Sequence, residues 1–135
     1  MADRSRVLVT GGAGFIGRRV VRALLAEGHE VTVADLRAFP DPAVRSVIGD
    51  LCDPDVPARA VRPGTDVIIH LAAFTYVLAS VKDPAGTYRI NTDVTARLLE
   101  LARQNEVGTF LFASTNAVTG NVGGAVISEQ TVLRP

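Results

Sequence analysis

The sequence predicts an α/β protein built on a doubly wound parallel sheet with the strand order 3-2-1-4-5. The first observation behind this prediction is that short apolar runs alternate with stretches of helical periodicity up to about residue 114. The second is a glycine-rich stretch, TGGAGFIG, between the first apolar run and the first periodic stretch. A length of 135 residues suffices for one hydrophobic core, so we expect a single domain over 1–135.

Five strands are expected at five short apolar runs, of which the first, RVLVT, is rich in β-branched residues and lacks strict alternation. Strands of this kind are buried on both faces of a parallel sheet, and right-handed crossovers join them. The expected strands are 6–10, 30–35, 44–50, 66–73 and 108–114.

The first expected helix spans 15–27, and Gly28 follows it at the position of a left-handed cap. Its apolar face is formed by Ile16, Val20, Leu24 and Leu25. A second helix is expected to start at Asp53 and Pro54, an N-cap and first helical position, and Pro57 keeps it short.

The same cap signal, Asp83 and Pro84, predicts a long helix that runs to about Gln104. After Ser114 the pattern loosens into a segment with paired glycines and no helical period. We therefore expect 114–135 to form an active-site loop followed by a small hairpin, within the single domain.

Composition excludes several functions. The chain has 14 basic and 14 acidic residues and 5% aromatics, which argues against nucleic acid as a partner. The longest apolar stretch, VIIHLAAFTYVLA, has 13 residues, whereas a membrane span needs about 20, so no membrane partner and a cytoplasmic location are expected. Cys52 is the only cysteine, which excludes an intrachain disulfide, and no metal site is indicated.

The glycine stretch satisfies G-x-G-x-x-G at Gly12, Gly14 and Gly17, and G-x-x-G-x-x-G from Gly11. It follows an expected strand and opens an expected helix, which is the Rossmann-type context for a dinucleotide. Gly14 would let the backbone approach a pyrophosphate, and Gly17 would let the helix pack closely on the sheet. The alternative is a glycine-rich turn that binds no ligand.

Asp35 ends the second strand, where an acidic side chain accepts hydrogen bonds from the adenosine ribose and repels a 2′-phosphate. This favours NAD over NADP, although Arg37 is close enough in sequence to pair with such a phosphate. Alternatively, Asp35 is only a turn residue. Asp50 follows the third strand and is either an adenine contact or a plain turn aspartate. His29 and His70 are both expected to be structural.

With these motifs in order, the chain resembles the extended short-chain dehydrogenase/reductase family, which includes nucleotide-sugar epimerases and dehydratases. TGGAGFIG resembles its cofactor loop, GDL at 49–51 its adenine-side turn, and HLAA at 70–73 the end of its fourth strand. SVKDP at 80–84 resembles the segment before its long helix, and FASTNAVTG at 112–120 its catalytic-loop strand.

The resemblance implies that NAD binds along one edge of the sheet and that the chain pairs into a homodimer through the 84–104 helix. It also implies a nucleotide sugar as the small-molecule substrate. The expected cofactor-binding residues are Gly11, Gly14, Phe15, Ile16, Gly17, Asp35, Leu36, Arg37, Asp50, Leu51, Leu71, Ala72, Ala73, Asn91, Ala113 and Ser114.

Thr115 is the expected catalytic residue, because a Ser or Thr there hydrogen-bonds the reacting hydroxyl or carbonyl in the family. The alternative is a loop threonine whose hydroxyl is satisfied by the backbone. Two positions depart from the family's dehydratases, which carry Asp-Glu where this chain has Asn116 and Ala117. Neither residue can transfer a proton, so sugar 4,6-dehydration is disfavoured. Thr119 stands where the family usually has a tyrosine.

The family's Tyr-x-x-x-Lys pair is absent, because Tyr76 and Tyr88 are followed four residues later by Ser80 and Thr92. SEQTVLRP resembles the segment just before the catalytic helix, so the chain stops short of that tyrosine. We therefore expect the NAD-binding part of an epimerase or reductase, truncated before the catalytic helix and substrate domain. The alternatives are a module that holds NAD without turning it over and, less well matched, a methyltransferase.

Overall fold

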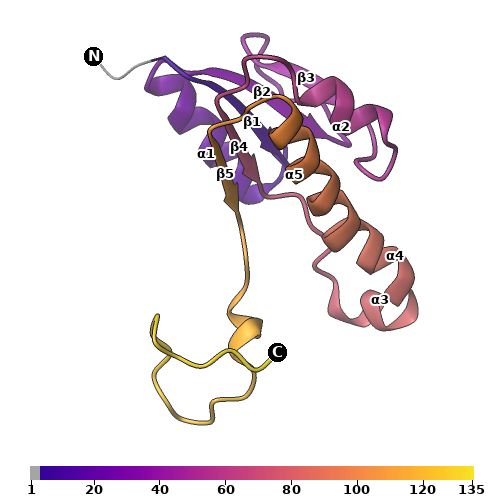
Figure 1. The fold of residues 1–135 in the computed structure, drawn as a ribbon, viewed down its shortest axis with the longest axis vertical. Coiled ribbons are helices and arrows are strands. Elements are labelled where there is room, and N and C mark those ends of the chain that lie inside the picture. The colour runs from indigo at the N-terminus through magenta and orange to yellow at the C-terminus, as the bar shows by residue number, and fades with distance from the viewer. Residues whose placement is uncertain (1–3) are drawn as a thin grey trace.

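The computed structural model describes residues 4–135 and contains a five-stranded sheet in the order β3-β2-β1-β4-β5 (Figure 1). All four neighbouring pairs are parallel, which confirms the predicted fold class and strand order. Val9 lies opposite Val33 on one side and Ile69 on the other. The strands are β1 (Arg6–Thr10), β2 (Glu30–Asp35), β3 (Arg45–Ile48), β4 (Val67–His70) and β5 (Thr109–Phe112).

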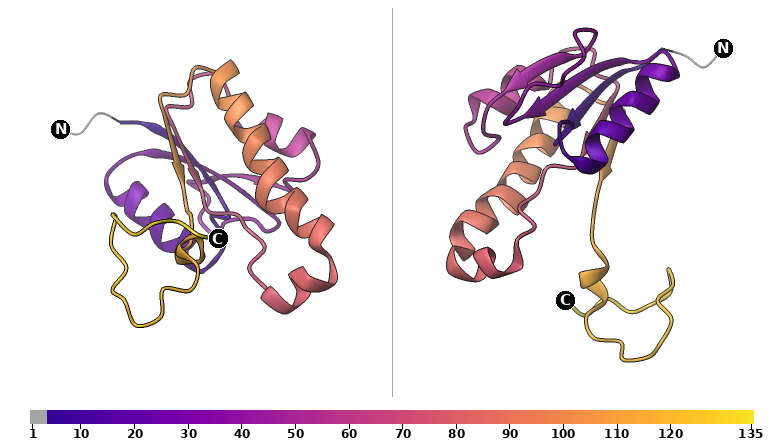
Figure 2. Two further views of the ribbon diagram at one scale, coloured as in Figure 1. Left: turned by 60° about the horizontal axis from the view of Figure 1, so that its bottom comes forward. Right: turned by 180° about the vertical axis from the view of Figure 1, so that it is seen from behind.

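Helices cover both faces of the sheet. Figure 2 shows helix α1 (Phe15–Ala26) on one face and α5 (Val94–Gln104) on the other, with α2 (Asp55–Ala60) beside α5. The remaining helical segments are α3 (Val77–Lys82), α4 (Pro84–Tyr88), a π-helical turn (Arg89–Asp93) and a 3₁₀ helix (Asn116–Thr119). Among residues 4–135, no helix has the length and apolar character that a membrane span requires.

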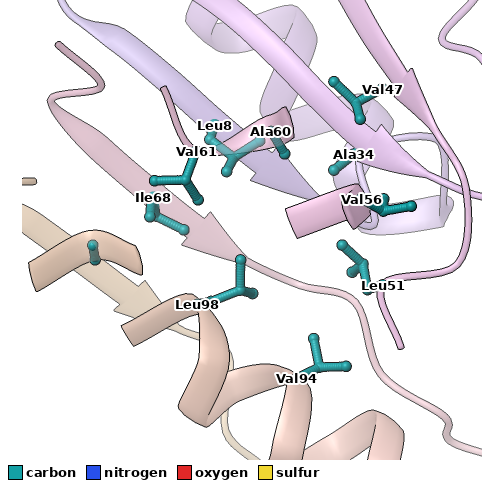
Figure 3. Packing of buried hydrophobic residues seen from close by; sticks show 11 residues of the cluster. Leu8, Ala34, Val47, Leu51, Val56, Ala60, Val61, Ile68, Val94 and Leu98 are labelled. Carbon is teal, nitrogen blue, oxygen red and sulfur yellow. The ribbon is translucent and has the colours of Figure 1, made fainter. Parts of the chain in front are cut away.

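The two-residue period of the strands divides the core into two layers. Val7, Val9, Val31 and Val33 point toward α1, where they pack with Val21. Leu8, Ala34 and Ile68 point the other way, toward α2 and α5 (Figure 3). From the helices, this second layer receives Val56, Ala60, Val94, Leu98 and Ala102.

The ends of α1 follow the sequence signals. Gly28 has φ +84° just after the helix, and the amide of His29 donates to the carbonyl of Leu24 over 3.0 Å. The second helix begins at Asp55, slightly later than expected, and Asp53 accepts from the Asp55 amide at 3.0 Å. The third cap forms as predicted, since Asp83 accepts from the Gly86 amide at 2.8 Å.

Two features differ from the expectations. The helix after Pro84 is not uniform, because the π-helical turn at 89–93 separates α4 from α5. The hairpin expected within 114–135 is not formed in the structure, where this segment holds the 3₁₀ helix and turns but no strand. The segment leaves the end of β5 and extends away from the sheet (Figure 1). Its backbone bonds include those from the amide of Ala125 to the carbonyl of Val122 and from the amide of Thr131 to the carbonyl of Ser128, which close single turns.

Candidate dinucleotide-binding site

A cleft of about 340 Å³ lies at the carboxyl edge of the sheet, where the loops after four of the strands meet. This is the switch point of a doubly wound sheet, where ligands of such folds bind. Most of its lining residues are cofactor contacts expected from the sequence. Its lining is Gly11, Gly14, Ala34, Asp35, Leu36, Gly49, Asp50, Leu51, Leu71, Ala72, Ala73, Phe74 and Ile90.

The turn between β1 and α1 needs glycine at two positions. Gly11 has φ +68°, and a Cβ there would lie 2.8 Å from the amide nitrogen of Ala72. A Cβ on Gly17 would collide with the carbonyl oxygen of Gly11 and lie 2.6 Å from Cα of Gly12. Glycine at these positions therefore lets the turn pack against both the loop after β4 and the start of α1.

Gly14 plays a different part at the amino end of α1. It occupies the N-cap position of this 12-residue helix, and within residues 4–135 no side chain forms a capping hydrogen bond to the first turn. A Cβ on Gly14 would meet only the carbonyl oxygen of Gly11, at 3.1 Å. The first amides of α1 and the helix dipole thus form a place suited to an anion beside the cleft.

Asp35 is held by two backbone amides at the end of β2. Its Oδ2 accepts from the amide of Ala13 at 3.0 Å, and its Oδ1 accepts from the amide of Arg37 at 3.1 Å. Each carboxylate oxygen has a second lone pair, so the side chain can still accept bonds from a ligand. Asp35 therefore holds the glycine turn, and it also lines the cleft in which the sequence predicts a ribose contact.

Two arginine side chains bind the glycine turn at Ala13, the residue whose amide binds Asp35. Arg18 Nε donates to the carbonyl oxygen of Ala13 at 2.9 Å, and Arg37 Nη2 reaches the same oxygen at 3.4 Å. They border a second hollow of about 470 Å³, which lies against the glycine turn. Its lining is Ala13, Gly14, Phe15, Arg18, Arg19, Arg22 and Arg37.

Asp50 sits in the turn after β3, where its Oδ1 accepts from the amide of Cys52 at 2.9 Å. It too lines the cleft while it stabilises a turn. Burial, followed by the charge of Asp50, raises the pKa of the Cys52 thiol, which keeps that thiol protonated near neutral pH.

Asn91 lies in the π-helical turn, and its amide is used within the protein. Its Oδ1 accepts from the amide of Phe74 at 2.8 Å, and its Nδ2 donates to the carbonyl of Phe74 at 3.0 Å. Asn91 therefore fixes the loop after β4, whereas its neighbour Ile90 lines the cleft. The expected contacts lack four of the lining residues, Ala34, Gly49, Phe74 and Ile90. Phe74 and Ile90 could not be predicted, because only the folded loop and the π-helical turn bring them to the cleft.

The expected residues from the end of β5 are not brought to the cleft. The amide of Ala113 donates to the carbonyl of His70 at 3.2 Å, which extends the β4–β5 ladder by one step. Beyond it Ser114 is exposed, and Thr115 caps the 3₁₀ helix by accepting from the amide of Ala117 at 3.2 Å. Phe15 and Ile16 also lie outside the cleft lining, with 83% and 62% of their surfaces exposed.

Within residues 4–135, no group of three or more His, Cys, Asp or Glu side chains is placed to hold a metal ion.

Comparison with known proteins identifies the family of the chain. The sequence model of the NAD dependent epimerase/dehydratase family matches residues 7–135. The UDP-glucose 4-epimerase of Thermus thermophilus, solved with NAD, is 40% identical with a TM-score of 0.88, and the match covers 96% of this chain and 44% of that one. The dTDP-glucose 4,6-dehydratase of Streptomyces niveus is 36% identical over 96% of this chain and 44% of its own length.

The UDP-glucose 4-epimerase of Streptococcus mutans is also 36% identical, over 96% of this chain and 41% of its own length. The chain thus spans less than half the length of these relatives. The fold, the position of the cleft and the match over nearly the whole chain agree, and the chain belongs to the NAD-dependent epimerase/dehydratase family.

Proposed function

We propose that this chain is the NAD-binding part of a sugar-nucleotide epimerase or reductase that acts by hydride transfer. The observation that carries the proposal is the cleft in which the glycine turn meets Asp35 and the loops after β3 and β4. Related solved structures hold NAD together with UDP-glucose or UDP-glucuronic acid. When bound, NAD supplies the carbon that accepts a hydride and returns it.

The residues present fit a dinucleotide. The pyrophosphate would lie against the first amides of α1, where Gly14 has no side chain to exclude it. Asp35 would accept from the hydroxyls of the adenosine ribose, and Asp50 and Leu51 would border the adenine. The backbone of 71–73 would form the opposite wall of the cleft.

We further propose that NAD is preferred over NADP. The carboxylate of Asp35 lines the cleft itself and would repel a 2′-phosphate. The guanidinium groups of Arg18 and Arg37 both donate to the carbonyl of Ala13 in the glycine turn. Their charge reduces this repulsion, so the preference depends on the balance between Asp35 and these two arginines.

Within the family, the segment after β5 favours epimerisation or reduction over dehydration. Thr115 would hydrogen-bond the hydroxyl or carbonyl that reacts. Asn116 and Ala117 follow it, and neither can donate or accept the proton that elimination of water requires. We accordingly assign Thr115 a substrate-orienting role and no role as a base, because an unperturbed alcohol is too weak a base near neutral pH.

A second candidate is a module that holds NAD without turnover. Neither Tyr76 nor Tyr88 is followed four residues later by a lysine, so the residues after Pro135 decide between the two candidates: a Tyr-x-x-x-Lys pair there would favour the enzyme, and its absence there would favour this module. Mixing the 135-residue chain with NAD and UDP-glucose tests whether these residues suffice for chemistry, and we expect binding without turnover. If the chain does turn over and Tyr76→Phe abolishes the reaction, Tyr76 is the base, and the chain carries its own catalytic group.

The proposed assembly is a homodimer through the segment 84–104. Its outer surface carries Tyr88 and Leu99, with 60% and 48% of their surfaces exposed. Sedimentation of the wild-type chain and of a Leu99→Glu variant tests this, and a dimer unaffected by the substitution would contradict it. A cytoplasmic location remains a prediction from the sequence.

Gly14→Val tests the proposed function. Its side chain would occupy the place of the pyrophosphate, so the affinity for NAD should fall at least about a hundredfold. Gly108→Val is the matched control, because Gly108 is exposed, and a Cβ there would lie 3.7 Å from its nearest contact, the carbonyl oxygen of Asp66. Calorimetry that gives Gly14→Val the affinity of the wild type would refute the site.

A further inference from the structure

A buried chain of hydrogen bonds joins three segments that border the cleft. His70, the last residue of β4, is 2% exposed, and its two ring nitrogens face different threonines. Nδ1 lies 2.6 Å from Oγ1 of Thr10, at the end of β1, and Nε2 lies 3.0 Å from Oγ1 of Thr95, in the first turn of α5. One side chain therefore connects the glycine turn, the loop after β4 and α5.

The direction of each bond follows from the number of protons available. With the Thr95 hydroxyl donating to the carbonyl of Asn91 at 3.1 Å, its oxygen accepts from Nε2–H of His70. Nδ1 is then the acceptor of the neutral ring, and it receives the proton of Thr10. Oγ1 of Thr10 in turn accepts from the amide of Ala72 at 3.3 Å.

These bonds hold the cleft wall at two points. The amide of Ala72 is bound to Thr10, and the backbone of Phe74 is bound on both sides by the side chain of Asn91. Ala72 and Phe74 both line the cleft. The two anchors converge on His70, because Thr10 and Thr95 are its partners.

The surroundings of His70 favour the neutral ring. Burial lowers the pKa of His70. From β5, the rings of Phe110 and Phe112 lie 6.2 and 5.9 Å from its centroid, and from β1 and α5 it is faced by threonine hydroxyls. A proton on Nδ1 would force Thr10, which is fully buried, to direct its hydroxyl to another acceptor.

We propose that His70, as the neutral Nε2–H tautomer, is a positioning residue that sets the distance between the glycine turn and the 71–74 wall for the dinucleotide. The inference rests on the proposed function, because the ligand that this wall is positioned to bind is NAD. This role differs from a purely structural one, because it predicts that a variant with a broken link stays folded and still binds NAD more weakly.

The test removes one link without touching the cleft lining. Thr95→Val keeps the shape of the side chain but cannot accept from Nε2 or donate to Asn91, and we expect the affinity for NAD to fall about tenfold. Thr95→Ser restores the hydroxyl and should bind within about twofold of the wild type. Thr32→Val, the same change in β2 outside this hydrogen-bond chain, is the control.

Calorimetry measures binding, urea denaturation shows that each variant is folded, and amide exchange by NMR reports on Ala72 and Phe74. We expect faster exchange at these two amides in Thr95→Val but not in Thr95→Ser or Thr32→Val. A folded Thr95→Val with unchanged affinity and unchanged exchange would overturn the proposal. If the wild type binds no NAD, the proposed function fails, while the exchange rates still decide whether His70 positions the wall.

The tautomer is checked on the wild-type chain, which removes any dependence on a variant that fails to fold. Nitrogen-15 spectra near neutral pH should show a protonated Nε2 and an unprotonated Nδ1 for His70. A protonated Nδ1 would contradict the bond directions on which the proposal depends.

Discussion

At the scale of single residues, Asp35 divides its carboxylate oxygens between the backbone of the glycine turn and the backbone of Arg37. Replacing it affects the turn as well as the ribose contact, so an affinity for one coenzyme cannot separate the two effects. The ratio of affinities for NAD and NADP can, because both coenzymes need the same turn and only one carries the 2′-phosphate.

For Asp35→Ala we expect the affinity for NAD to fall about tenfold or more, since hydrogen bonds to a charged group contribute about 1.5–3 kcal/mol. The preference for NAD over NADP should fall by at least about tenfold, because the repulsion of the phosphate is removed. Asp41→Ala is the control, as Asp41 also accepts from a backbone amide but in an exposed turn. A preference unchanged by Asp35→Ala would move the ribose contact to another residue.

His70 predicts a pH dependence of the free energy of unfolding. Its pKa is lowered in the folded chain by burial, whereas in the unfolded chain it is near 6.5. The unfolded state therefore binds more protons below about pH 6.5, and this contribution to stability, complete above that pH, is lost as pH falls toward the folded pKa. The loss has a limiting slope of about 1.4 kcal/mol per pH unit.

Urea denaturation between about pH 7.5 and 5, a range that spans the unfolded pKa, measures this contribution. The control is His70→Gln, which has no titrating ring at this position and should show a flatter dependence over the same range. Parallel curves for the two proteins would show that His70 titrates alike in the folded and unfolded chain.

At the scale of elements, the strands and α1 are predictable because their signals are local. Buried valines in β1 and β2 and the glycine after α1 suffice, whatever the rest of the chain does. The π-helical turn makes a tertiary contact, the two bonds between Asn91 and Phe74, which no period in the sequence shows. Helix α3 was missed because it has no buried residue and hence no amphipathic pattern.

The packing of α5 makes a quantitative prediction at this scale. Leu98 is fully buried against the sheet, whereas its neighbour Leu99 is 48% exposed. We expect Leu98→Ala to lower the free energy of unfolding by about 2–5 kcal/mol, as cavity-forming substitutions do. Leu99→Ala should cost less than about 1 kcal/mol. Equal losses in urea denaturation would contradict the orientation of α5.

At the scale of the whole molecule, the cleft could be predicted because the carboxyl ends of parallel strands meet at one edge. This rule brings together the glycine turn, Asp35, Asp50 and the loop that begins at Leu71, which are far apart in the sequence. It does not place Thr115, which lies beyond the end of β5 in a segment that leaves the sheet (Figure 1). The position of that segment depends on contacts that strand order alone does not specify.

The most direct test of the central claim is an NMR titration of the 135-residue chain with NAD. We expect saturable shifts at the amides of Gly11–Gly17, at 35–37, at 49–51 and at 71–74, four segments that are separate in the sequence and that each contribute residues to the cleft lining. Adenosine diphosphate should reproduce the shifts around the glycine turn, Asp35 and Asp50, because it carries the adenosine and pyrophosphate groups. An absence of saturable shifts, or shifts confined to the opposite edge of the sheet, would contradict the account.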